Sequence, residues 1–237
     1  MKEQRKATEE QNISKVECSC GRCDTADAGD GRALHILYET AAGRVLLRLL
    51  SARWVSRVCG AFLDSRLSVP MIKGFAERSG ICMEDYLDSS FSSFNEFFTR
   101  RIRPELRPIT TEPELLPSPC DGRLSAYHIR DGFVLPIKQS RYSIADLLRD
   151  GELADRYRGG ICLVFRLCVD NYHRYHYIDA GRQSGNVFIR GRLHTVRPIA
   201  LRSVPVFTEN CREYTVMETE HFGTVTEVEV GAMLVGK

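Results

Sequence analysis

The chain has 237 residues, of which 43% are hydrophobic and 27% charged, proportions typical of an ordinary soluble globular protein. Its 33 Lys and Arg and 31 Asp and Glu leave a net charge of +2, so no strong overall field predicts binding to nucleic acid. No apolar run reaches the roughly 18 residues that a transmembrane helix needs, which excludes a membrane span but not binding to a membrane surface.

The nine cysteines predict reduced thiols and not a disulfide framework. Six of them stand singly, mostly inside apolar patterns, as buried free thiols do in a cytoplasmic protein. The odd total and the lack of a secretory leader agree with this prediction. These six are Cys59, Cys82, Cys120, Cys162, Cys168 and Cys211.

Residues 1–30 are polar, charged and rich in small residues, and we predict a disordered extension there. It contains Cys18, Cys20 and Cys23, whose close spacing suits zinc. A structural zinc site, however, needs four ligands, usually as two separated pairs, and no histidine precedes His35. The cluster is therefore interpreted as a metal site, as a redox-sensitive tail or as a segment without a function.

Residues 31–108 read as a helical region. Large apolar side chains recur every fourth residue from Leu46 to Phe62, which predicts an amphipathic helix. Such a helix either packs on a core or docks on a membrane, with Trp54 in the interface and cationic side chains reaching phosphate headgroups. The arginines that border the apolar arc are Arg44, Arg48, Arg53 and Arg57.

Two further helices are predicted in this region. Pro70 opens a short helix over 71–78 that ends at Gly80. A Ser or Asn cap with an acidic first turn begins another helix near Phe94.

From 109 onward, short runs rich in Val, Ile, Leu and aromatic residues alternate with Gly, Pro and Asp turns. We predict a β-rich domain over 109–237 that is incomplete at its C-terminus and contains one helix, roughly Ser143 to Leu148. The fold class is α+β, with an N-terminal helical region followed by a mainly antiparallel β-rich domain. The predicted strands are 123–129, 133–137, 161–169, 184–189, 214–219 and 225–235.

Two short segments contain the candidate chemical groups. Asp121 lies in a Pro-x-Asp-Gly turn, which is a common structural unit because Asp caps its own turn and Gly accepts positive φ. His173 and His176 follow a strand-like run and precede Ile178, so we place them in a loop where each can act separately. They are candidates for acid–base chemistry, for metal ligation or for a structural role; a metal would need a third ligand, which the sequence does not mark.

Five blocks stand in the order found in phosphatidylserine decarboxylases, and the chain resembles that family from about Leu34 to its last residue. Five blocks in order are far more specific than any one of them. The blocks are FNEFFTR at 94–100, SPCDG at 118–122, IKQSRYS at 137–143, DNYHRYH at 170–176 and VGAMLVG at 230–236.

The resemblance implies a proenzyme that cuts itself within a Gly-Ser-Thr or Gly-Ser-Ser motif and leaves a pyruvoyl group as its cofactor. That ketone forms a Schiff base with phosphatidylserine, and loss of carbon dioxide gives phosphatidylethanolamine. By the same resemblance, Asp121 and His176 activate the serine for self-cleavage, and His173 supports decarboxylation. No metal and no nucleotide are implied.

The sequence departs from the family pattern at one important place. The processing serine of the family lies beyond the fifth block, and no Gly-Ser pair occurs among the 237 residues. Three explanations stand: a C-terminally truncated product, a large subunit whose small pyruvoyl-bearing subunit is separate, or a degenerate relative. We expect the chain as it stands to be inactive. A smaller departure is Cys211, which stands where a longer polar side chain is usual.

The resemblance also favours the membrane interpretation of residues 44–62, since the substrate is a lipid. The expected partners are phosphatidylserine and an anionic membrane surface at the cytoplasmic face, where the protein would be peripheral; no nucleic acid is expected, and a homodimer stays open. Two alternatives are a non-catalytic membrane-binding relative and a pyruvoyl decarboxylase for a soluble amino compound.

Overall fold

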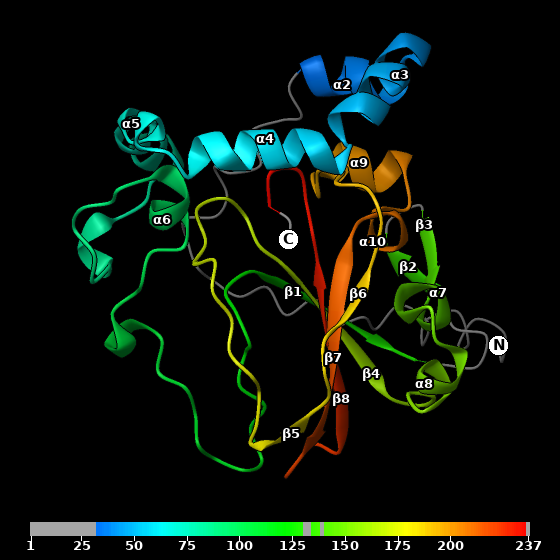
Figure 1. Ribbon diagram of the computed structural model, residues 1–237. Helices are drawn as coiled ribbons and strands as arrows, with labels where there is room; N and C mark the ends of the chain where they lie inside the picture. The colour runs from blue at the N-terminus through cyan, green and yellow to red at the C-terminus, as the bar shows by residue number, and fades with distance from the viewer. Residues whose placement is uncertain (1–31, 130–133, 138–139, 236–237) are drawn as a thin grey trace, which may run out of the picture.

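The computed structural model describes residues 32–129, 134–137 and 140–235. The cysteines at 18, 20 and 23 and residues 138–139 of the third block lie outside the described residues. Helices come first in the chain and antiparallel strands follow, which confirms the predicted α+β class. In Figure 1, α4 lies across the upper end of the strands.

The N-terminal helices form this upper part of the molecule. They are α2 (Arg32–Glu39), α3 (Ala41–Leu50), α4 (Arg53–Leu63) and α5 (Pro70–Ser79). A short 3₁₀ turn, Arg66–Ser68, joins α4 to α5, and two more lie at Met83–Asp85 and Pro104–Leu106. As predicted, Pro70 begins α5, and Gly80 ends it in the left-handed conformation with φ of 64°.

The amphipathic pattern from Leu46 to Phe62 is divided between two helices. Ala52 is extended, with φ of −72° and ψ of 140°, and separates α3 from α4. Ser51 beside it is fully buried, and its carbonyl accepts a hydrogen bond of 3.0 Å from the Leu193 amide. The helix therefore breaks where the backbone bonds to a distant segment, an interaction that local periodicity does not reveal.

The main sheet is built around β7 (Arg212–Thr219). On one side β7 pairs with β8 (Thr224–Val230), and on the other with β5 (Gly181–Gln183) and β6 (Val187–Ile189), all antiparallel. Alternating Val and Thr favour extended backbone in β8, and Gly223, with φ of 70°, closes the β7–β8 turn.

Two antiparallel ribbons complete the strands. One pairs β1 (Arg123–His128) with β4 (Ile161–Arg166), and the other pairs β2 (Val134–Ile137) with β3 (Ser140–Ser143). The strand predicted over 161–169 thus ends at Arg166, and β3 and β5 were not predicted.

The prediction of one helix in this region is wrong, because the described residues contain four short ones. They are α7 (Ile144–Leu148), which was predicted, α8 (Gly151–Asp155), α9 (Pro198–Ser203) and α10 (Val206–Glu209). Ile199 and Val206 of α9 and α10 are buried with Tyr38 and Leu47 of the upper helices in one apolar cluster. Helices of four to six residues show little periodicity, so tertiary packing decides their conformation.

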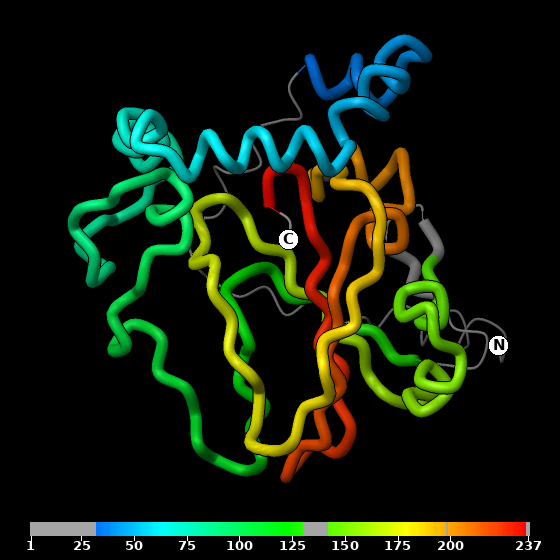
Figure 2. Tube along the Cα trace, in the orientation of Figure 1, coloured from blue at the N-terminus to red at the C-terminus, as the bar shows by residue number. Residues whose placement is uncertain are grey.

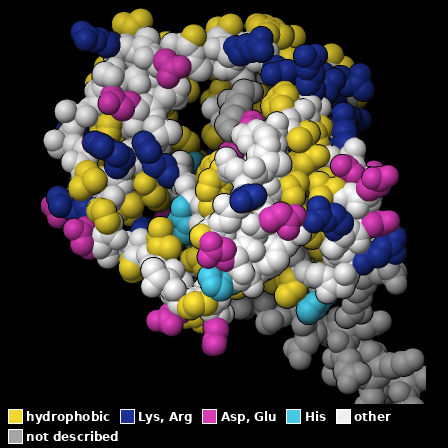
Figure 3. Space-filling view, turned by 60° about the horizontal axis from the view of Figure 1, so that its bottom comes forward, with side chains coloured by type: hydrophobic (Ala, Val, Ile, Leu, Met, Phe, Trp, Pro, Cys, Tyr) yellow, Lys and Arg dark blue, Asp and Glu magenta, His cyan; other side chains and the backbone are white. Residues whose placement is uncertain are grey.

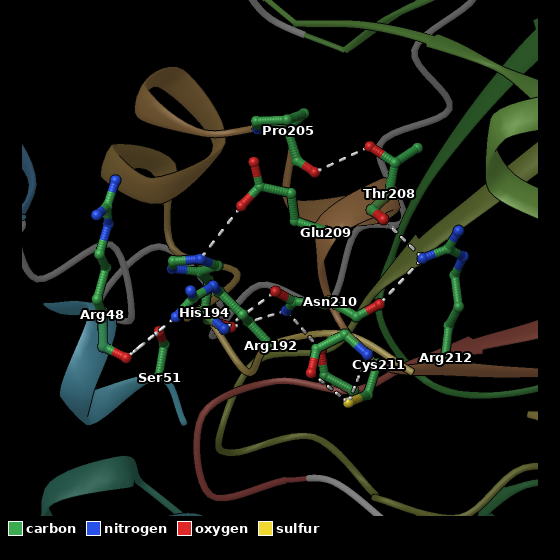
Figure 4. Close-up of polar contacts among 12 residues, drawn as sticks. Arg48, Ser51, Arg192, His194, Pro205, Thr208, Glu209, Asn210, Cys211 and Arg212 are labelled. Atoms are coloured by element: carbon green, nitrogen blue, oxygen red, sulfur yellow. Dashed lines mark hydrogen bonds and ion pairs between the residues drawn. The ribbon is translucent and has the colours of Figure 1, made fainter. Parts of the chain in front are cut away.

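The last predicted strand does not run to Val235. β8 ends at Val230, and the chain turns back after it, with Ala232 paired to Val235 (Figure 2). The fully buried Asn210 holds this turn, since its Nδ2 donates to the Gly231 carbonyl at 2.7 Å. Asn210 also exchanges two hydrogen bonds with the His194 backbone, at 3.0 and 2.9 Å (Figure 4).

Candidate active site

The second and fourth sequence blocks lie side by side. Cys120 and Tyr175 form an isolated antiparallel bridge, and the His176 amide donates to the Pro119 carbonyl at 2.9 Å. Residues 170–177, which include both histidines, form no regular helix or strand, as predicted. Backbone pairing therefore brings the Asp121 turn and the histidine loop together, although about fifty residues separate them in the sequence.

Asp121 is held as an anion by an arginine that sequence reasoning missed. Arg107 donates to both carboxylate oxygens, with Nε 2.7 Å from Oδ1 and Nη2 2.9 Å from Oδ2, and the Tyr172 amide adds a contact of 3.3 Å to Oδ2. Burial raises the pKa of Asp121, but these hydrogen bonds and the charge of Arg107 more than offset it, so the pKa lies below its ordinary value. The carboxylate is thus ionised at neutral pH.

His173 is held against α6 (Phe94–Phe98), which begins at the predicted Ser93 cap. Its ring centroid lies 4.1 Å from that of Phe98, and Nδ1 lies 2.9 Å from the Asn171 carbonyl oxygen. A carbonyl can only accept, so Nδ1 carries the proton and Nε2 has a free lone pair. Burial lowers the pKa of His173, which keeps the ring neutral near pH 7.

His176 points its Nδ1 at the Tyr177 carbonyl, at 2.8 Å, so its Nε2 is also the basic nitrogen. Among the described residues, no hydrogen bond joins His176 to Asp121. The histidine whose charge affects the pKa of Asp121 is His173. The structure therefore brings Asp121 into electrostatic contact with His173, and connects it to His176 through the backbone pairing of the two blocks.

A second group of polar side chains faces this site from β8. Glu227 and Glu229 alternate with valines, so they share one face of the strand. Glu229 accepts a hydrogen bond of 2.9 Å from the Tyr175 hydroxyl, and burial together with the charge of Glu229 raises the pKa of Glu227 to about 7. Burial, with the charges of Asp121 and Glu227, raises the pKa of Cys120 to about 11, so this thiol is not a nucleophile at neutral pH.

The signal for Glu227 and Glu229 was present in the sequence. Two acidic residues that alternate with valines in one predicted strand mark a charged face of that strand. No comparable signal marks Arg107 in the sequence. It precedes Asp121 by fourteen residues, and only the folding of the intervening loop brings its guanidinium to the carboxylate.

A large apolar surface lies on the upper helices. Val45 and Leu49 of α3 and Trp54, Val58 and Phe62 of α4 are 45–70% exposed, whereas Leu47 on the opposite face of α3 is buried. Arginines 44, 48 and 57 on the same helices are exposed. Figure 3 shows hydrophobic side chains next to a group of Lys and Arg along the upper rim of the molecule. No helix within the described ranges is long and apolar enough to cross a bilayer.

Comparison with known proteins gives a consistent result. The sequence profile of the phosphatidylserine decarboxylase family matches residues 94–237. "Phosphatidylserine decarboxylase proenzyme 2" of Clostridium acetobutylicum is 43% identical over 205 residues, which cover 86% of this chain and 70% of that protein. "Phosphatidylserine decarboxylase proenzyme" of Ruminiclostridium cellulolyticum is 42% identical over 218 residues, 90% of this chain and 73% of that protein. The same-named protein of Clostridium novyi is 40% identical over 214 residues, 88% and 72% of the two chains.

Proposed function

Because the chain belongs to the phosphatidylserine decarboxylase family of carboxy-lyases, we propose that it forms the catalytic scaffold of an enzyme that converts phosphatidylserine to phosphatidylethanolamine and carbon dioxide. The observation that carries this proposal is the pairing of the Asp121 turn with the histidine loop. It supports a site in which the anionic Asp121 carboxylate, the neutral His173 imidazole and the His176 ring lie on adjoining segments.

The family depends on a pyruvoyl group, whose conjugated carbonyl accepts the electron pair released when carbon dioxide leaves. The residues present fit such a group. A neutral His173 with a free Nε2 can accept or return a proton beside a carbonyl, and Phe98 supplies an apolar wall that keeps water away. We propose that His173 moves the proton that replaces the departing carboxylate.

For self-processing we assign Asp121 and His176 to the activation of the serine hydroxyl. Serine is a weak nucleophile at neutral pH and needs a base that a third group orients. His176 offers Nε2 as the base, and we assign the role of the third group to Asp121, an ionised carboxylate on the segment that pairs with the histidine loop. The serine itself is not among the 237 residues, so we propose that the chain as it stands neither cleaves itself nor decarboxylates.

This proposal is tested by comparing the 237-residue chain with the same chain continued through a segment that contains Gly-Ser-Thr. The continued protein is expected to split into two subunits, to react with a ketone-specific hydrazide on the smaller one, and to release carbon dioxide from phosphatidylserine vesicles. The 237-residue chain should do none of these. A continued protein that cleaves and labels but accepts only soluble serine derivatives would contradict the lipid substrate.

We further propose that the apolar surface of α3 and α4 docks on the cytoplasmic face of an anionic membrane. The exposed apolar side chains supply buried area, and the neighbouring arginines supply attraction to phosphate headgroups. All six cysteines within the described ranges are free thiols, which supports a reducing compartment.

Serine substitution of both Trp54 and Val58 is expected to weaken sedimentation of the chain with phosphatidylserine vesicles by at least about tenfold, because each change removes apolar area that the bilayer would bury. The matched control is Leu115→Ser, since Leu115 has the same 57% exposure as Trp54 but lies in a loop outside the upper helices. Equal vesicle binding by the double variant and the control would contradict the docking surface.

A further inference from the structure

Three consecutive residues at the end of α6 each contact the histidine loop. The Phe98 ring packs on the His173 ring at 4.1 Å, and the Thr99 carbonyl accepts from Arg174 Nε at 2.8 Å. Arg100 Nη2 donates to the Asp170 carbonyl at 3.4 Å. The loop has no regular secondary structure of its own, so these contacts, together with the pairing to the Asp121 turn, determine where its side chains point.

Arg100 is unusual because it is a buried cation without a carboxylate partner. It is 1% exposed, and within the described part of the chain no ion pair joins it to Asp or Glu. Its guanidinium lies over the rings of Tyr86, at 4.2 Å, and Phe97, at 4.9 Å, and Nη2 donates to the Tyr86 hydroxyl at 3.0 Å. Nε has no hydrogen-bond partner among the described residues.

Burying an unpaired positive charge costs free energy, which cation–π contacts and carbonyl acceptors offset only in part. Lysine could not make the same set of contacts, because they need a planar guanidinium that stacks on rings and donates at its edge. Stability alone would be served as well by an apolar side chain. The presence of an arginine at this position therefore indicates that its positive charge has a role other than stabilising the fold.

We propose that Phe98 and Arg100 are positioning residues for His173: Phe98 fixes the plane of the imidazole, and Arg100 fixes the loop and places its positive charge beside the ring. This inference rests on the proposed role of His173 in proton transfer and extends it to two residues that need not touch the substrate. The charged groups that influence His173 are Arg100, Asp170 and Asp121. Burial is the main cause that lowers the pKa of His173; the charge of Arg100 acts in the same direction, and the two carboxylates act against it.

The test uses the 237-residue chain and NMR titration of the His173 ring protons, whose signal is identified by its loss in His173→Gln. In Arg100→Met the pKa of His173 is expected to rise by at least about half a unit, a threefold change in the protonation equilibrium, because a nearby positive charge is lost. Arg100→Lys keeps the charge and should leave the pKa close to that of the parent. In Phe98→Leu the ring-current shift of the His173 protons should disappear.

The matched control is Arg101→Met, which removes a positive charge one residue away but from an arginine that is 60% exposed and paired with Asp88. It should leave the His173 titration unchanged. An unchanged pKa in folded Arg100→Met, or an equal rise in Arg101→Met, would overturn the role of Arg100. If Arg100→Met does not fold, Arg100→Gln removes the same charge, and an unchanged His173 pKa in that variant would overturn the role of Arg100. A retained ring-current shift in Phe98→Leu would overturn the role of Phe98.

This readout does not depend on catalysis. If the continued protein failed to decarboxylate while His173 titrated as expected, the proposed function would fall and the positioning role would stand. In an active continued protein, Phe98→Leu should lower kcat with little change in KM, as expected of a residue that orients a reacting group without binding the substrate.

Discussion

Asp121→Asn is expected to slow self-processing by at least about a hundredfold in a protein where the chain continues through the serine motif, since general-base machinery contributes roughly 10²–10⁴ in rate. Asparagine keeps the shape of the side chain but removes the negative charge of the proposed third group. His176→Ala removes the proposed base itself and should slow processing to a similar degree. The measurement is the fraction of cleaved chain against time on a denaturing gel.

The loss of a paired aspartate could also act through stability, and the chain offers a control for this. Asp88 forms the same kind of bidentate contact with Arg101, at 2.6 and 3.2 Å, outside the proposed site. Asp88→Asn should therefore cost a similar amount of ion-pair energy, which is small for pairs with one exposed partner, and leave processing intact. Processing of Asp121→Asn at the parent rate would remove Asp121 from the mechanism.

His173→Ala is expected to leave self-processing and hydrazide labelling in place but to lower the turnover of phosphatidylserine by about 10²–10⁴. The reason is that His173 is the partly buried, neutral imidazole of the loop, packed on Phe98, whereas His176 is the histidine assigned to the serine. The measurement is carbon dioxide released per labelled subunit, which separates the cofactor content from the rate of the chemical step.

The exposed His128 on β1 supplies the control, and His128→Ala should behave as the parent in both assays. If His173→Ala lost hydrazide labelling as well as turnover, His173 would have a role in self-processing too. Turnover at the parent rate in His173→Ala would contradict the proposal that His173 transfers the proton in decarboxylation.

Local signals predicted those parts of the structure that local interactions determine. The Ser93 cap, the Gly80 end of α5 and the Ser143 start of α7 all stand where the sequence placed them, because a cap needs only one side chain and the next backbone amides. The histidine loop was likewise predicted, and the two blocks that the sequence singled out are those that the fold brings together.

The errors fall where distant residues decide the outcome. The helix break at Ser51 depends on Leu193, and the early end of β8 depends on Asn210, neither of which is near in sequence. The partner of Asp121 was missed for the same reason, since nothing in the Asp121 turn itself indicates Arg107. The membrane interpretation of residues 44–62 is consistent with the exposed face of α3 and α4, but the division into two helices changes the angle at which the two halves would meet a bilayer.

The buried amide of Asn210 has a mechanical consequence. It joins the turn after β8 to the His194 backbone, and the two residues before His194 bond to the end of α3. The Leu193 amide donates to the Ser51 carbonyl, and the Arg192 guanidinium donates to the Arg48 carbonyl. The helix α3, proposed to rest on the lipid, and the turn after β8 are therefore linked by a short series of hydrogen bonds. In the proposed enzyme, a phospholipid would therefore react while its acyl chains stay in the leaflet. The membrane-bound helices would hold the reacting segment at the lipid headgroup, so the lipid would not have to leave the bilayer.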